Sequence, residues 1–135
     1  MKGEEILVLI KHRLEQAEES LKDAKVLLAE DCSSRSIVNR AYYAMFYAVL
    51  ALLQKIGKVP RKHSGAISLF DTEFVLKGLF SKGFSKDLHD VFNLRQVSDY
   101  QVLDTLTPKN AETALKRAEG FVEAVRKHLI GENKS

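Results

Sequence analysis

Apolar residues at helical spacing run through most of this chain, and this periodicity limits its fold more than any other feature. In residues 4–29 they recur every three or four positions, and the same period returns in residues 34–56 and 108–130. No segment alternates apolar and polar residues at the period of a β-strand, and no strand-turn dipeptide such as Asn-Gly occurs. The chain is therefore predicted to be all-α.

Two shorter helical patterns complete the prediction, over residues 64–76 and 84–101, with a glycine-containing break between them. Gly57 is placed to end the second helix, and Thr107-Pro108 to start the last. Helices of ~25 residues are ~38 Å long, and short connections between such rods favour antiparallel neighbours. We expect a single domain over residues 1–135, an up-and-down bundle of four to five helices, with residues 131–135 as a flexible tail.

The composition excludes several classes of protein. Cys32 is the only cysteine, which rules out an internal disulfide and a multi-cysteine metal site and fits a reducing compartment. The four histidines lie on separate segments without a metal-binding spacing, so neither a metal nor another cofactor is predicted. The N-terminus lacks the pattern of a signal peptide, and the apolar run 41–53 is shorter than the roughly 18 residues that cross a bilayer. We expect a cytoplasmic protein without a membrane partner.

Positive charge is concentrated in the middle third of the chain. Residues 32–70 contain six Lys or Arg and no Asp or Glu, whereas residues 1–31 contain five Lys or Arg and eight Asp or Glu. Such a block can bind phosphate or nucleic acid, or it can face the acidic first helix. The basic residues just after the end of the second predicted helix are the ones that core packing accounts for least. The candidates for nucleotide or RNA binding are therefore Lys58, Arg61 and Lys62.

Arg95 interrupts the apolar face of the helix at 84–101. At about 100° per residue, it falls on the same face as Leu88 and Val91, with Asp99 one turn further on. An arginine stays charged, so it needs a carboxylate, a cavity that holds water or phosphate, or a second subunit. Each of these settings implies a different function.

A polar stripe lies on the helix at 34–56, away from its small apolar face. Arg40, Tyr43 and Tyr47 line up there with Ser36 and Gln54. Tyrosine combines a flat apolar ring with a polar tip. The stripe can therefore fill a wet dimer interface, contact a nucleotide or RNA, or belong to an ordinary core helix.

Taken together, these residues resemble the HEPN domain family, in particular the small bacterial and archaeal proteins encoded beside minimal nucleotidyltransferases. The resemblance runs from the first predicted helix to the last. It implies a helical bundle that forms a homodimer, with the Arg95 end of each protomer facing a shared cleft. The matching segments are Ser36, Arg40-Ala41-Tyr42-Tyr43-Ala44-Met45-Phe46, Lys62-His63, Phe70, and Arg95 followed by Asp99-Tyr100.

Many HEPN domains resemble metal-independent RNases, whose motif is an arginine, often a polar neighbour, and a histidine after four to six further residues. Such cleavage needs a base, an acid and a cation that stabilises the transition state. Arg95 and Gln96 match the start of the motif, but positions 100–102 hold Tyr, Gln and Val. The motif histidine is missing, and tyrosine is a poor base at neutral pH.

Four residues remain as catalytic candidates. Arg95 is the candidate cation, and His63, Asp99 and Tyr100 are the candidates to handle protons, although Asp99 can pair with Arg95 and is then a weaker base. A capping or hydrogen-bonding role suits His63 equally well. The other histidines are expected to point away from Arg95 or to lie on the surface: His89, His12 and His128.

We therefore expect a HEPN protein that binds a minimal nucleotidyltransferase, in a toxin-antitoxin or RNA-related defence module, and that is not catalytic alone. One alternative is an RNase with a degenerate Arg-x4-Tyr motif. The other is a non-catalytic nucleotide- or RNA-binding module that uses Arg40, Tyr43, Tyr47 and Arg95. RNA or a nucleotide is a further candidate partner.

Overall fold

The computed structural model describes residues 3–100 and 106–131, apart from the side chain of Tyr100. None of these residues forms a strand, so the all-α prediction is confirmed. The predicted tail beyond Gly131, and the motif positions Gln101 and Val102, lie outside the described residues. The elements are α1 (Gly3–Ala29), α2 (Ser34–Lys55), α3 (His63–Phe70), the π-helical turn η1 (Asp71–Val75), α4 (Lys82–Tyr100) and α5 (Pro108–Ile130).

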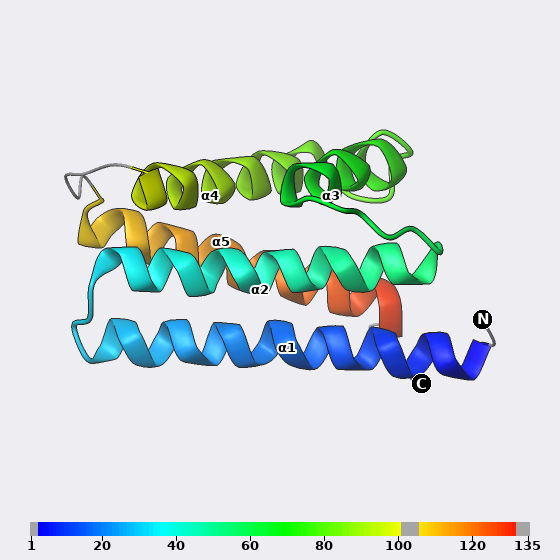
Figure 1. Ribbon diagram of the computed structural model, residues 1–135, viewed down its shortest axis with the longest axis horizontal. Helices are drawn as coiled ribbons and strands as arrows, with labels where there is room; N and C mark the ends of the chain where they lie inside the picture. Colours follow the sequence, from blue (N-terminus) through cyan, green and yellow to red (C-terminus); the bar gives the residue numbers. More distant parts are fainter. Residues whose placement is uncertain (1–2, 101–105, 132–135) are drawn as a thin grey trace.

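The four long helices run alternately up and down, and both ends of the chain lie at the same end of the bundle (Figure 1). The short α3 lies beside α4, on one side of α2. Helix α2 packs against each of the other four α-helices. The predicted up-and-down bundle is confirmed, and side chains on α2 are placed to contact residues from distant parts of the sequence.

Local signals explain most of the helix boundaries. The Ser33 side chain accepts a hydrogen bond from the Ser36 backbone N–H at 3.1 Å and caps α2. Gly57, just past the end of α2, has a φ of 73°, a conformation that favours glycine. At the start of α5, Thr107 and Asn110 form a reciprocal capping box ahead of a helix that begins at Pro108.

The region between α2 and α4 differs from the prediction. The helix expected over 64–76 is α-helical only to Phe70 and then widens into η1, while α4 begins at Lys82, two residues earlier than expected. In η1 the Leu76 N–H donates to the Asp71 carbonyl at 2.8 Å. The Asp71 carboxylate accepts hydrogen bonds from Ser85 Oγ at 2.7 Å and His89 Nε2 at 2.6 Å. The η1 turn is therefore held by contacts with α4, and the spacing of residues along one helix does not reveal such contacts.

Helix α2 forms the centre of the core. Its length and composition alone would allow it to cross a membrane, but 61% of its most apolar stretch is buried inside the bundle. We therefore interpret α2 as a core helix. Its predicted small face is fully buried, at Ala41, Ala44, Met45, Ala48 and Leu52.

Candidate functional site

Arg95 lies against two tyrosine rings of α2. Its guanidinium carbon is 5.2 Å from the centre of the Tyr42 ring and 5.4 Å from that of Tyr43, both within the range of a cation–π interaction. Its Nη2 also donates a long hydrogen bond, 3.5 Å, to the Tyr43 hydroxyl. Leu88 and Val91, which share the predicted face of α4 with Arg95, are fully buried, and Arg95 lies against aromatic rings.

Asp99 is the carboxylate partner of Arg95. Its Oδ2 lies 2.9 Å from Arg95 Nε, but the N–H does not point at the oxygen, and Nε is buried without a hydrogen-bond partner among the described residues. The contact is therefore an ion pair without an aligned hydrogen bond. Of the three settings considered for Arg95, a carboxylate is the one seen within the single chain.

His63, at the start of α3, belongs to the same cluster. Its ring stacks on Phe46, with centres 4.1 Å apart and planes 8° apart, and its Nδ1 is 2.7 Å from the Tyr42 hydroxyl. Tyr42 is 0% exposed, and burial raises the pKa of its phenol well above 10 although Arg95 opposes the change. The phenol therefore stays protonated.

The buried hydroxyl of Tyr42 has no other hydrogen-bond partner among the described residues. A buried hydroxyl satisfies its proton, so we assign the O–H as the donor and Nδ1 as the acceptor, which leaves the proton of neutral His63 on Nε2. Burial, and secondarily the charge of Arg95, lowers the pKa of His63 below 6.5. At neutral pH His63 is thus an uncharged hydrogen-bond donor, and it can act as a base only if Nδ1 leaves Tyr42.

The predicted stripe on α2 continues this cluster. The guanidinium of Arg40 lies 5.2 Å from the centre of the Tyr43 ring, and its Nε and Nη2 both donate to Asn39 Oδ1, at 3.2 and 3.0 Å. The Tyr47 ring follows 6.0 Å from that of Tyr43. The structure therefore brings Arg40, Tyr43 and Tyr47 together with Arg95.

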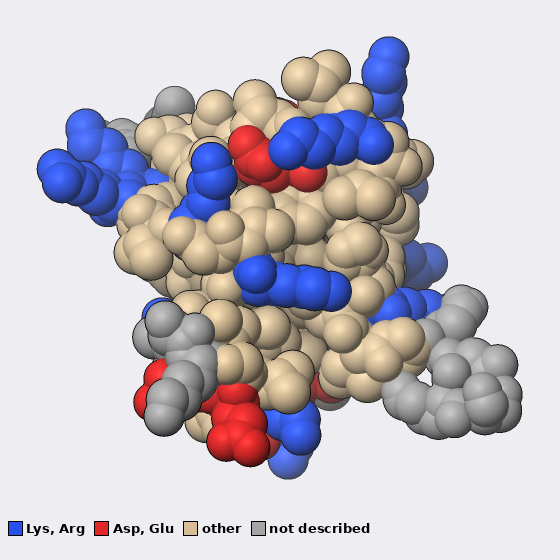
Figure 2. Space-filling model, turned by 90° about the vertical axis from the view of Figure 1, so that its right-hand side faces the viewer, with Lys and Arg blue, Asp and Glu red and all other residues tan. Residues whose placement is uncertain are grey.

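The three basic residues after α2 do not form one group with that cluster. Lys58 lies at the end of α2, 3.7 Å from Glu73, whereas the following loop runs back across α2 through Arg61 and Lys62 to His63 (Figure 1). Viewed from this end, Lys and Arg side chains spread over the surface, and Asp and Glu side chains gather in a few places (Figure 2). Lys62 is thus next to the aromatic cluster, and Lys58 belongs to the end of the bundle.

Two of the three remaining histidines have structural partners. His89 pairs with Asp71 and does not contact Arg95, as expected, and His12 is exposed. The prediction for His128 is wrong: it is half-buried, and its ring centre lies 5.1 Å from that of Phe80. Within residues 3–100 and 106–131, no three His, Cys, Asp or Glu side chains gather closely enough to hold a metal, and the prediction of no metal stays a prediction.

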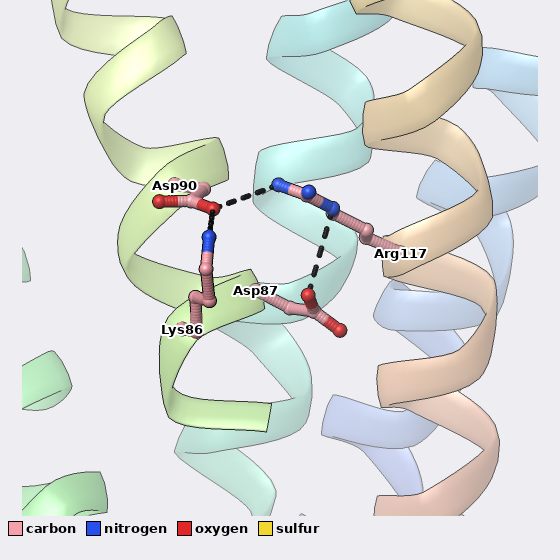
Figure 3. A network of polar contacts seen from close by, with 4 residues as sticks. All are labelled: Lys86, Asp87, Asp90 and Arg117. Atoms are coloured by element: carbon pink, nitrogen blue, oxygen red, sulfur yellow. Dashed lines mark hydrogen bonds and ion pairs between the residues drawn. The ribbon is translucent and has the colours of Figure 1, made fainter. Parts of the chain in front are cut away.

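A polar network that the sequence did not predict joins α4 and α5. Arg117 Nη1 lies 2.9 Å from Asp90 Oδ2 and its Nε 3.5 Å from Asp87, and Lys86 also reaches Asp90, at 2.7 Å (Figure 3). Hydrogen bonding by Lys86, helped by the charges of Lys86 and Arg117, lowers the pKa of Asp90. The sequence indicates only the pairing of Lys86 with Asp90, which are four residues apart on one helix, because Arg117 is on another helix.

The fold and this site define a small all-α domain built around an arginine-centred aromatic cluster. Residues 10–128 match the HEPN domain, and the chain belongs to this family. A UPF0332 protein of Thermotoga maritima is 39% identical over 119 residues, which cover 88% of this chain and 89% of that protein. "Putative toxin MJ0605" of Methanocaldococcus jannaschii is 39% identical over 126 residues, covering 93% and 90%, and "Putative toxin MJ0142" of the same organism is 32% identical over 120 residues, covering 89% and 81%.

Proposed function

We propose that this HEPN domain is the toxin-type member of a toxin-antitoxin or RNA-related defence pair and binds a minimal nucleotidyltransferase. Two relatives that match most of the chain carry the word toxin in their names. The observation that carries the proposal is the state of the Arg95 cluster. Its cation is paired with Asp99, and the acceptor nitrogen of His63 is occupied by Tyr42, which favours binding over catalysis by the free chain.

We propose that the nucleotidyltransferase binds the end of the bundle where exposed apolar side chains lie among lysines. Val59 is 84% exposed and Leu76 is 81% exposed. Their neighbours Lys58 and Lys77 both contact Glu73, at 3.7 and 2.8 Å, so the two segments lie together and the carboxylate is neutralised. Exposed apolar side chains with a basic rim are typical of protein-binding surfaces. The surface of the partner is then expected to be acidic around an apolar centre.

Co-expression of this chain with its native gene neighbours, among which the proposal requires a minimal nucleotidyltransferase, tests the proposal. We expect the two proteins to co-purify, and Val59→Glu with Leu76→Glu to abolish the complex by placing carboxylates in the contact. Val26→Glu is the matched control, because Val26 is 53% exposed on α1, away from this end. If the unmodified proteins do not associate, the partner is wrong; if the double variant binds as well as the unmodified chain does, the surface is wrong.

A homodimer is proposed through the half-buried rings of Phe46 and Tyr47, which remain accessible beside the core. Sedimentation equilibrium measures the mass in solution. A dimer that Tyr47→Glu converts to monomer is expected, and a monomer for the unmodified chain at micromolar concentration excludes the proposal.

A metal-independent RNase is the second candidate function. Arg95 and His63 are 32 positions apart in sequence, yet both contact Tyr42, so a cation and an imidazole share one site. Incubation of the purified chain with RNA in the presence of a chelator decides the case. Cleavage that is lost in both Arg95→Ala and His63→Ala supports an enzyme, whereas equal residual cleavage in the variants indicates a contaminant.

A further inference from the structure

A groove with a volume of about 530 Å³ runs between α1 and α5. Helix α1 lies on the opposite side of α2 from α4, so the groove is remote from the Arg95 cluster (Figure 1). Helix α1 lines it from Lys11 to Glu19, and α5 lines it near its C-terminal end. Further along, Lys25 and Glu119 join the same two helices at 2.9 Å. The groove therefore occupies the half of the two helices that is nearer the chain ends.

The floor of the groove is apolar. Leu14 lies there with Ile130, the last residue of α5, whose side chain is exposed. Leu7 is two turns before Leu14 on the same face of α1, and both Leu7 and its neighbour Val8 are exposed. The apolar surface thus continues past the end of the groove. Exposed apolar side chains that lie together, with polar residues around them, are typical of protein-binding surfaces.

The rim of the groove is acidic. Three exposed glutamates of α1 line it within little more than one helical turn, at Glu15, Glu18 and Glu19. None of the three forms a hydrogen bond or ion pair with another described residue. Arg126 also lines the groove, but its Nη2 and Nε donate to Glu123 at 2.7 and 3.2 Å. Lys11 is then the one cation of the lining that is left to balance three carboxylates, so the rim attracts positive charge.

A basic amphipathic helix matches both properties of this groove. A helix can lie between two others and pack a row of apolar side chains, spaced three or four residues apart, into the groove that they form. Lysine and arginine on either side of that row have long apolar stems, so their charged ends can reach carboxylates at the rim. We propose that the groove between α1 and α5 binds a lysine- or arginine-rich amphipathic helix of a partner protein.

This inference goes beyond the proposed function and does not depend on it, because the surface around Val59 and Leu76 is basic and is expected to bind an acidic partner. Its test is fluorescence anisotropy of the purified full chain with labelled peptides of about 14 residues, which are ~21 Å long as helices. The first peptide has leucines at helical spacing and lysines elsewhere. The second has the same residues in an order without helical period, and the third has glutamates in place of the lysines.

We expect the first peptide to bind at least about tenfold more tightly than either of the others, and added salt to weaken the binding. The whole chain has a net charge of +3, so its overall charge does not favour a basic peptide. Tight binding of the first peptide alone therefore indicates a local acidic and apolar site.

Glu15→Gln with Glu18→Gln is expected to weaken binding of the first peptide about fivefold, because each exposed ion pair contributes modestly. Ile130→Ser is expected to weaken it by a similar factor through lost apolar contact. Glu30→Gln with Glu112→Gln is the matched control, since it changes the net charge equally at exposed residues outside the groove lining. The inference is overturned if the first peptide does not bind, if it binds no better than the other two, or if the control variant weakens binding as much as the groove variants.

Discussion

The Tyr42 hydroxyl and His63 Nδ1 share a hydrogen bond of 2.7 Å across 21 positions of sequence. It joins the start of α3 to the middle of α2, directly beneath the guanidinium of Arg95, whose carbon lies 5.2 Å from the Tyr42 ring centre. The bond therefore links the stability of the bundle to the geometry of the site.

Replacement of Tyr42 by Phe removes the donor and leaves the ring in place. We expect the free energy of unfolding to fall by about 1 kcal/mol, the usual net worth of a buried hydrogen bond. Urea unfolding measures the change. Tyr47→Phe is the control, because the Tyr47 hydroxyl has no hydrogen bond to a described residue, and its effect is expected to stay below about 0.5 kcal/mol. Equal effects of the two variants would contradict the role of the pair.

Stability is expected to fall as the pH drops below 6.5. Burial, followed by the charge of Arg95 for His63 and of Lys55 for His128, lowers the pKa of both side chains below their ordinary value of 6.5. Between that value and the lower pKa of the folded protein, the unfolded chain binds protons that the folded chain does not. The stabilisation is therefore complete above pH 6.5 and is lost on acidification.

Urea unfolding over a pH series, with NMR titration of the imidazole rings, measures this dependence. His63→Asn is expected to flatten the profile just below pH 6.5, because one of the two described histidines with a lowered pKa is then gone and His128 is left. The lowered pKa values of Glu73, Asp90 and Glu123 act below about 4.5 and do not interfere. A pKa of His63 at or above 6.5 in the folded chain is the contrary result.

Arg117 is expected to stabilise the contact of α4 with α5 by a small, salt-dependent amount. Its side chain is 32% exposed, so screening by water limits the network to about 0.5–1 kcal/mol in the Arg117→Met variant, which keeps most of the apolar stem. The difference is expected to shrink at high salt. Arg126→Met, which breaks an exposed pair with Glu123, serves as control with a smaller loss. A loss that does not depend on salt would mean that packing, and not charge, is responsible.

Arg95 is expected to matter more for function than for stability. Arg95→Met gives up contacts with two rings, worth about 0.5–1 kcal/mol each, but it also removes a buried Nε that has no hydrogen bond among the described residues. We expect a net change below about 1.5 kcal/mol by urea unfolding. Leu88→Ala on the same helix is the reference, since this residue is fully buried and should lose about 2–5 kcal/mol. Similar losses would assign Arg95 a structural role.

Much of the candidate site followed from residue type and helical period. Arg95 and Asp99 are one helical turn apart and form the expected ion pair, and Arg40, Tyr43 and Tyr47 share a face because α2 is regular. The sequence alone leaves two roles open for His63, proton transfer and hydrogen bonding, because its partners Tyr42 and Phe46 are on another helix. The Asp87, Asp90 and Arg117 network and the half-buried setting of His128 were missed for the same reason.

The sequence by itself determined that this chain is a helical bundle, where α1, α2 and α5 start and end to within one residue, and which side of α2 enters the core. These properties depend on contacts within a few residues, which periodicity and capping record. Only the tertiary structure decided that Tyr42 holds His63, that Arg40 and Asp99 line one pocket, and that Arg117 joins α4. Such contacts depend on the distances and crossing angles between helices, and packing across the whole core sets these values.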